Sequence, residues 1–157
     1  MSPLDSLSWH NAQHKPVKLS SMLEFLSSVG KSSMIHVGCD SHFVKNNCVY
    51  AIVVAIITPG KGGTYFFARK ILKRKNFLNM KLRLLGEVER ALLLADLVSS
   101  HTSRDDVSVH LDINPNKMYK SSLVFTSATS WVKSQGYRCV VKPDAWASSW
   151  LADAYAK

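Results

Sequence analysis

The stretch that decides the fold contains three apolar segments, MIHVGCDSHF (34–43), CVYAIVVAIIT (48–58) and GTYFFARKIL (63–72). Each segment is rich in β-branched and aromatic residues, which is typical of strands. Asn46-Asn47 and the glycine-rich run 59–63 separate the segments. Because these separators are short, consecutive strands are expected to pair antiparallel. The stretch therefore predicts an antiparallel meander of three strands.

Helices and strands alternate after this meander. Apolar residues recur at helical spacing in 81–100, and further helices are expected over 119–135 and 145–157. Short strands are expected in VSVHLDIN (107–114) and YRCVVKPD (137–144). A crossover helix joins parallel strands and covers an apolar sheet face. The sequence thus predicts an α/β fold with a mixed five-stranded sheet, three antiparallel strands followed by alternating helices and strands, flanked by helices.

The N-terminal segment is expected to pack on this domain. Residues 1–17 have no sustained period and predict an irregular arm or an edge contribution to the sheet. Residues 18–30 predict a short helix that ends at Gly30 and places four apolar residues on one face, namely Leu19, Met22, Leu23 and Leu26. The expected organisation is an arm with a short helix over 1–32 and a single α/β domain over 33–157.

Composition indicates a globular protein with an anionic partner. With 46% apolar residues, the chain can bury a core without disulfides, and its three cysteines form no CxxC motif. The sequence has no run of about 18 apolar residues and no apolar secretory leader, so we expect a cytoplasmic protein, in the host cytoplasm if it is phage-encoded, with no membrane partner. The 20 Lys and Arg against 11 Asp and Glu favour nucleic acid as the partner.

Two aspartates lie near strand ends that should meet. Asp40 is in HVGCDSH, towards the end of the first strand of the meander, and Asp112 is in VHLDIN, towards the end of the fourth strand. In this topology those two strands are adjacent and parallel, so both carboxylates emerge at one end of the sheet. Each residue alone also suits a turn. Together they favour a metal site, because two-metal phosphoryl hydrolysis needs carboxylates that converge on ions about 4 Å apart.

Glu87 is the candidate on the long helix. At about 100° per residue it lies closer to the apolar stripe than Glu89, so it is the better inward-pointing residue. Glu87 could equally lie at the solvent-exposed edge of the apolar stripe and form an ion pair with Arg83 at i−4 or Arg90 at i+3.

Asp144 is the candidate for the fourth acid. It follows the fifth strand and begins the closing helix, where Asp is also a favoured N-cap. A capping role and a metal-binding role are compatible, because both place the carboxylate at the end of the sheet. Asp153, further along the closing helix, is the competing fourth acid.

Four motifs resemble the YkuK group of ribonuclease H-like proteins, small bacterial and phage-associated proteins. They are, in order, GCDSH (38–42), GEVERALLLADL (86–97), HLDIN (110–114) and KPDAWASSWLAD (142–153). The resemblance extends over roughly residues 33–155, and HLDIN and KPDAWASS are its more specific motifs.

This resemblance implies a ribonuclease H fold and an acidic cluster that binds Mg²⁺ or Mn²⁺. The cluster maps onto Asp40, Glu87 (or Glu89), Asp112 and Asp144. It also implies hydrolysis that leaves a 3′-hydroxyl and a 5′-phosphate. One departure from the group is His42, which follows Asp-Ser where an amide side chain is expected.

A basic segment on the third strand and its exit is the candidate nucleic-acid contact. Lys70, Lys73, Arg74 and Lys75 lie there with Phe77, and such a mixture suits phosphate contacts with base or sugar stacking. A solvated surface would give the same pattern.

The function expected from these features is a metal-dependent endonuclease that hydrolyses phosphodiester bonds by a two-metal mechanism. Two alternatives use the same fold and charge: a structure-selective resolvase of branched, Holliday-junction-type DNA, and a non-catalytic nucleic-acid-binding module. RNA/DNA hybrid, duplex and branched DNA are the substrate forms to distinguish.

Overall fold

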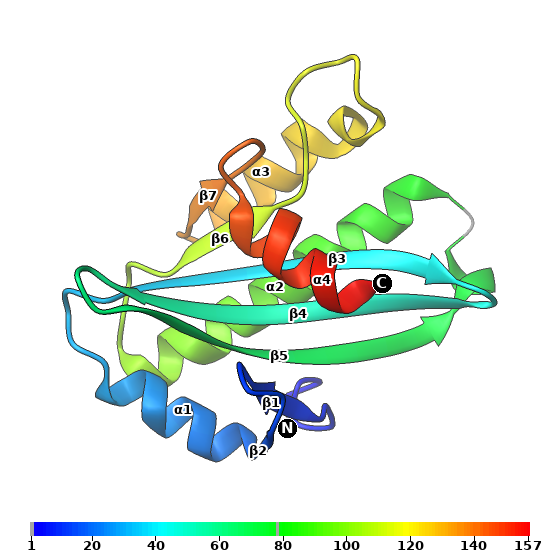
Figure 1. The fold of residues 1–157 in the computed structure, drawn as a ribbon. Coiled ribbons are helices and arrows are strands. Elements are labelled where there is room, and N and C mark those ends of the chain that lie inside the picture. The colour runs from blue at the N-terminus through cyan, green and yellow to red at the C-terminus, as the bar shows by residue number, and fades with distance from the viewer. Residues whose placement is uncertain (1, 78) are drawn as a thin grey trace.

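The computed structural model describes residues 2–77 and 79–157, and it shows one mixed sheet with helices on both faces (Figure 1). The strands lie in the order β2-β1-β5-β4-β3-β6-β7. Their bounds are β1 Trp9–Asn11, β2 Pro16–Val17, β3 Met34–Val44, β4 Asn47–Thr58, β5 Gly62–Lys73, β6 Ser108–Leu111 and β7 Arg138–Val140. The α-helices are α1 Leu19–Ser28, α2 Met80–Thr102, α3 Phe125–Ser134 and α4 Asp153–Ala156. The remaining helical segments are two 3-10 helices, η1 Arg74–Asn76 and η2 Lys120–Val124, and one π-helix, η3 Ala147–Ala152.

The long meander is present as the sequence predicts. Strands β3, β4 and β5 pair antiparallel along their length, from Met34 opposite Ile57 to Val44 opposite Asn47 in the first pair. Lys45 takes a positive φ of 56° in the tight turn between β3 and β4. Strand β6 pairs parallel with β3, and β7 pairs parallel with β6. The predicted mixed sheet of antiparallel and parallel strands is therefore confirmed.

Within the residues that the structure describes, the sheet has seven strands in place of the five expected, because the N-terminal arm adds two. Strand β1 pairs antiparallel with β5, and β2 pairs with β1. Trp9 anchors the arm: its side chain is 1% exposed and its indole N–H donates to the Leu4 carbonyl. These strands have only three and two residues, too few for an alternating pattern to be visible in the sequence. Strand β1 covers the middle of the β5 edge, at Phe66–Ala68, which would otherwise present unpaired backbone groups.

Successive residues of β3 face two different layers. Odd-numbered residues such as Val37 and Cys39 belong to the main core, which α1, α2 and α3 cover. On the opposite face, Ala51 of β4 packs in a smaller cluster with Ala147 and Ala152 of η3. Figure 1 shows α4 crossing one side of β3 and β4 while α2 runs along the other side. Asp40, which is paired with Ala51, therefore faces η3 and α4.

The helices follow the predicted ranges with two changes of geometry. The helix expected over 119–135 begins as the 3-10 segment η2 and continues as α3. The closing helix begins as the π-helical segment η3 and ends as α4. Within the described residues, no helix combines the length and the apolar character that crossing a membrane requires.

Candidate metal centre

Asp40 and Asp112 lie at neighbouring positions on two parallel strands. The register of β3 and β6 pairs Gly38 with His110 and Cys39 with Leu111. Asp40 is the next residue on β3 and Asp112 directly follows β6, so the two residues lie side by side at the C-terminal end of β6. The adjacency and parallel direction of these strands are as the sequence predicts.

Three ligand atoms converge on the η3–α4 side of β3. Asp40, His42 and Asp153 each offer one atom, and these atoms lie within 4.8 Å of one another, the arrangement of a group that could hold a metal ion. His42 Nε2 lies 3.2 Å from Asp40 Oδ2 and 2.8 Å from Asp153 Oδ1. Lys157 Nζ lies 2.8 Å from the other oxygen of Asp153. The structure thus brings the first strand of the meander together with the last helix.

Burial and negative charge determine the protonation of Asp40. The residue is 4% exposed, and burial followed by the nearby charge of Asp112 raises the pKa of Asp40 to about 7. Burial acts to raise the pKa of Asp153 as well, but hydrogen bonds from Lys157 and His42 outweigh it and hold that pKa below its ordinary value. The site therefore combines one carboxylate that resists ionisation with another that ionises readily.

Asp112 is fixed by two partners beside this group. Its Oδ1 accepts a hydrogen bond from Ser149 Oγ at 2.7 Å and lies 3.0 Å from Lys142 Nζ. Ser149 belongs to η3, so the same segment that leads to Asp153 also orients Asp112. Lys142 is 40% exposed and carries a positive charge to the rim of the site.

Glu87 is buried, as predicted, and it approaches from the opposite face of β3. It is 3% exposed, whereas the Glu89 side chain is 60% exposed. Ser41 Oγ donates to Glu87 Oε1 at 2.6 Å, and Arg83 Nη1 lies 3.8 Å from the same oxygen. Burial, then the charge of Asp40, raises the pKa of Glu87 well above its ordinary value. Glu87 thus lies next to the Asp40 position, separated from the three-atom group by the strand backbone.

Asp144 lies outside the three-atom group. Its side chain is exposed, and its backbone N–H donates to the Val141 carbonyl at 3.0 Å in the turn before η3. The residue that flanks η3 at its N-terminal end is Trp146, and no side-chain cap is made there. The expected capping by Asp144 is therefore wrong, because the chain makes another turn before the helix begins. Of the two alternatives for the fourth acid, Asp153 is the one placed within ligand distance of Asp40.

Close backbone contact positions η3 over the strand. A Cβ built on Gly38 would lie 2.7 Å from Ala147 C and Ser148 N, so only glycine allows η3 to lie this close to β3. The Ala147 N–H donates to His110 Nδ1 at 3.2 Å, and His110 Nε2 then donates to His36 Nδ1 at 3.1 Å. Burial, followed by the charges of His36 and Arg138, lowers the pKa of His110 to about 3, so this pair stays neutral.

His42 was identified from the sequence only as a departure from the family pattern. Strand alternation is the signal that could have placed it, because a residue two positions after Asp40 shares its sheet face. No comparable sequence pattern identifies the residues that contact the carboxylates of Glu87 and Asp112, which are Ser41, Lys142 and Ser149.

The predicted basic residues divide between two surfaces. Arg74 and Lys75 line a groove of about 580 Å³ together with Phe43, Phe77, Asn79, Met80, Arg83 and Lys120. The Arg74 guanidinium lies 4.3 Å from the centre of the Phe43 ring. Lys73 is exposed beside Arg74 and Lys75. Lys70 lies apart from these residues, in a pocket that also contains Leu4 and Glu89.

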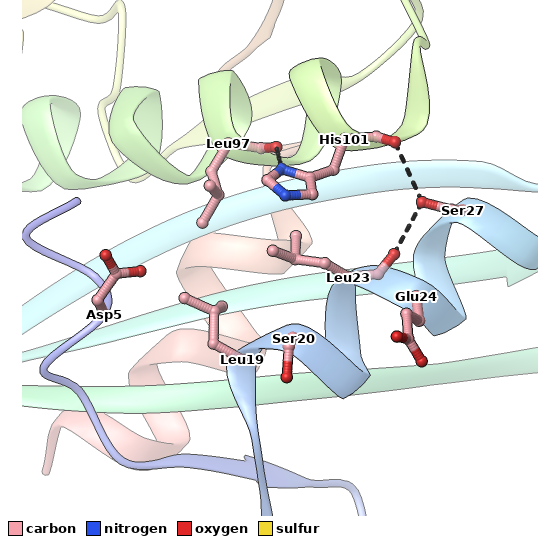
Figure 2. Close-up of a pocket in the computed structure, with 8 residues that line it drawn as sticks. All are labelled: Asp5, Leu19, Ser20, Leu23, Glu24, Ser27, Leu97 and His101. Atoms are coloured by element: carbon pink, nitrogen blue, oxygen red, sulfur yellow. Dashed lines mark hydrogen bonds between the residues drawn. The ribbon is translucent and has the colours of Figure 1, made fainter. Parts of the chain in front are cut away.

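A separate hollow of about 740 Å³ lies between α1 and α2 (Figure 2). Its lining residues are Asp5, Leu19, Ser20, Leu23, Glu24, Ser27, Leu97 and His101. His101 Nδ1 donates to the Leu97 carbonyl of its own helix at 3.2 Å, and Ser27 Oγ donates to the His101 carbonyl at 3.1 Å. This hollow shares no residue with the three-atom group, and the hydrogen bond from Ser27 joins its two helices.

The sheet order, the crossing helices and the acidic residues Asp40 of β3 and Asp112, directly after β6, define a mixed α/β protein with an acidic site. A family profile described as ribonuclease H-like matches residues 19–157, and the chain belongs to this family. Comparisons with curated proteins and with solved structures gave no match.

Proposed function

We propose that this protein is a divalent-metal-dependent endonuclease of the YkuK kind that hydrolyses phosphodiester bonds in nucleic acid. The observation that carries the proposal is the convergence of Asp40, His42 and Asp153 beside Asp112, where β3 runs past the end of the parallel strand β6. Membership of the ribonuclease H-like family supports the same reaction class.

The donor atoms fit a divalent ion. Two ligands at right angles, each about 2.1 Å from an ion, lie about 3.0 Å apart. The distances of 3.2 Å and 2.8 Å from His42 Nε2 to the two carboxylate oxygens are close to this spacing. The raised pKa of Asp40 reflects burial and the nearby charge of Asp112, and a bound cation would oppose both effects.

In this proposal Asp40, His42 and Asp153 hold one ion, and Asp112 and Glu87 supply further negative charge at the end of the strand. A bound divalent ion would supply activation of water and stabilisation of the leaving oxygen. Lys142, which lies 3.0 Å from Asp112 and is partly exposed, would contact a substrate phosphate at the rim. Ser149 and Ser41 orient the carboxylates of Asp112 and Glu87 through their hydroxyl groups.

The basic groove on the other side of β3 supports nucleic acid as the substrate. Arg83 bridges the two regions, because its Nη1 donates to the Ser41 carbonyl at 2.7 Å while the residue also lines the groove. The Nε of Arg83 is buried without a hydrogen-bond partner among the described residues. A phosphate in this groove would meet several cations and the Phe77 ring.

Cleavage assays with Mn²⁺ or Mg²⁺ on labelled RNA/DNA hybrid, duplex DNA and a four-way junction test the proposal. Cleavage of hybrid or duplex that leaves a 5′-phosphate supports the endonuclease. Cleavage confined to the junction identifies a resolvase. Binding without cleavage of any substrate identifies a non-catalytic module and refutes the proposed enzyme. The exposed Glu89 provides the matched control, since Glu89→Gln changes one acid on α2 outside the site.

A further inference from the structure

His42 gives the candidate ion site a nitrogen donor. Its Nε2 faces two carboxylate oxygens, Asp40 Oδ2 at 3.2 Å and Asp153 Oδ1 at 2.8 Å. An imidazole nitrogen carries at most one proton, so Nε2 can donate fully to only one of these oxygens. Two carboxylate oxygens around one imidazole nitrogen form the arrangement expected where all three atoms bind one cation.

The side chain of His42 reaches this position from a rigid strand. His42 and Asp40 are two residues apart on β3 and share a face, and β3 is paired on one side with β4 across both residues. Asp153 reaches the same point from α4, with its second oxygen held by Lys157 at 2.8 Å. His42 is 37% exposed, so an ion can exchange with solvent at this position.

Imidazole nitrogen distinguishes between divalent ions. Magnesium prefers oxygen ligands and retains its water, whereas first-row transition ions accept imidazole readily. We propose that His42 is a metal ligand that makes this site select a first-row transition ion, such as Mn²⁺, over Mg²⁺. This inference rests on the proposed function, because it names the ion that the same site uses.

The test measures ion binding to the metal-free protein without nucleic acid, so it does not depend on activity. Electron paramagnetic resonance follows Mn²⁺ binding directly, and Mg²⁺ is added as competitor. Pulsed measurements on the Mn²⁺ complex detect coupling to a ligating nitrogen. The variant His42→Gln replaces the imidazole with an amide, and His101→Gln is the control because His101 lies in the separate hollow between α1 and α2.

The expected result is a nitrogen coupling in the parent and in His101→Gln that is lost in His42→Gln. The preference for Mn²⁺ over Mg²⁺ should fall in His42→Gln by at least the roughly 10- to 100-fold that loss of an outer-shell partner costs in metal affinity. Binding of Mn²⁺ without nitrogen coupling in the parent would overturn the role of His42 and leave the carboxylate site and the proposed nuclease intact. Absence of any Mn²⁺ binding to the parent would overturn the proposed function as well.

Discussion

His42 Nε2 lies 2.8 Å from Asp153 Oδ1, although 111 positions separate the two residues in the sequence. The contact joins the end of β3 to α4 and completes the group that begins with Asp40. Formation of the site therefore depends on docking of the last helical segment against a strand from the first third of the chain.

Asp40 is the first residue to test, because it belongs to the three-atom group and lies beside Asp112. The change Asp40→Asn keeps the shape and removes the charge that would hold an ion, so cleavage should be abolished. Nucleic-acid affinity should be retained or increased, because it comes mainly from Lys and Arg contacts with phosphates. Parallel cleavage and filter-binding assays measure both quantities. Full activity in this variant would exclude Asp40 from the mechanism.

The raised pKa of Asp40 predicts a pH-dependent stability of the metal-free protein. Its pKa rises from 3.8 to about 7 on folding, so the folded chain binds a proton more tightly than the unfolded chain. Stability from this group is present at low pH and is lost as the pH rises towards and through about 7. Asp40→Asn should remove this dependence and stabilise the metal-free protein at pH 8 by on the order of 2 kcal/mol. Urea unfolding at pH 5 and pH 8 measures how much the free energy of unfolding differs between Asp40→Asn and the parent. An equal difference at both pH values would contradict the raised pKa of Asp40.

Glu87 and Glu89 form a matched pair on α2, one buried and one exposed. Glu87→Gln should lower turnover by roughly 10- to 100-fold or more, because it removes a carboxyl group that a bound cation would ionise beside the ion site. The fold should tolerate the change, since the raised pKa of Glu87 shows that its environment favours the neutral form. Glu89→Gln should leave turnover unchanged. Equal activity of the two variants would show that Glu87 has a structural role only.

Lys73, Arg74 and Lys75 are expected to contact substrate phosphates. Changing all three to Ala should flatten the slope of log affinity against log salt by up to about 2.7 on duplex DNA, at about 0.9 for each lost contact. Turnover at saturating substrate should stay close to that of the parent. The control changes Lys15, Lys18 and Lys31, three exposed lysines of the N-terminal region, and removes the same charge. Identical slopes for the two triple variants would make the segment a solvated surface.

The close contact of Gly38 with η3 predicts that the packing of η3 and ion binding are linked. A Cβ at this position would meet the backbone of η3 at 2.7 Å, so Gly38→Ala should displace η3 and cost about 1–3 kcal/mol of stability. Binding of Mn²⁺ should weaken too, because η3 leads to Asp153. Gly30→Ala is the control, since its nearest new contact is 3.9 Å away. Thermal unfolding and Mn²⁺ titration compare the two variants, and unchanged Mn²⁺ affinity in a destabilised Gly38→Ala would separate the two effects.

The sequence predicts those parts of the site that depend on strand order and helical phase. Asp40 and Asp112 follow from the order of the strands, and the burial of Glu87 follows from its angle to the apolar stripe of α2. The position of Asp153 does not follow in this way. Between Trp146 and Asp153 the chain is π-helical, with hydrogen bonds to the fifth residue along. A helical wheel drawn at 3.6 residues per turn therefore assigns the residues beyond this segment to the wrong helix face.

The alternation of side chains along β3 limits how the protein can change over evolutionary time. One face of the strand supplies the core through Val37 and Cys39, and the other supplies Asp40 and His42. An insertion or deletion of one residue would exchange the two faces, and so would expose the core and bury the ion ligands in a single event. Divergent descendants of this gene should therefore keep the length of residues 34–44 unchanged, and should accept substitutions there at positions other than Gly38, Asp40 and His42. The turn at 59–61, between β4 and β5, should vary freely in length.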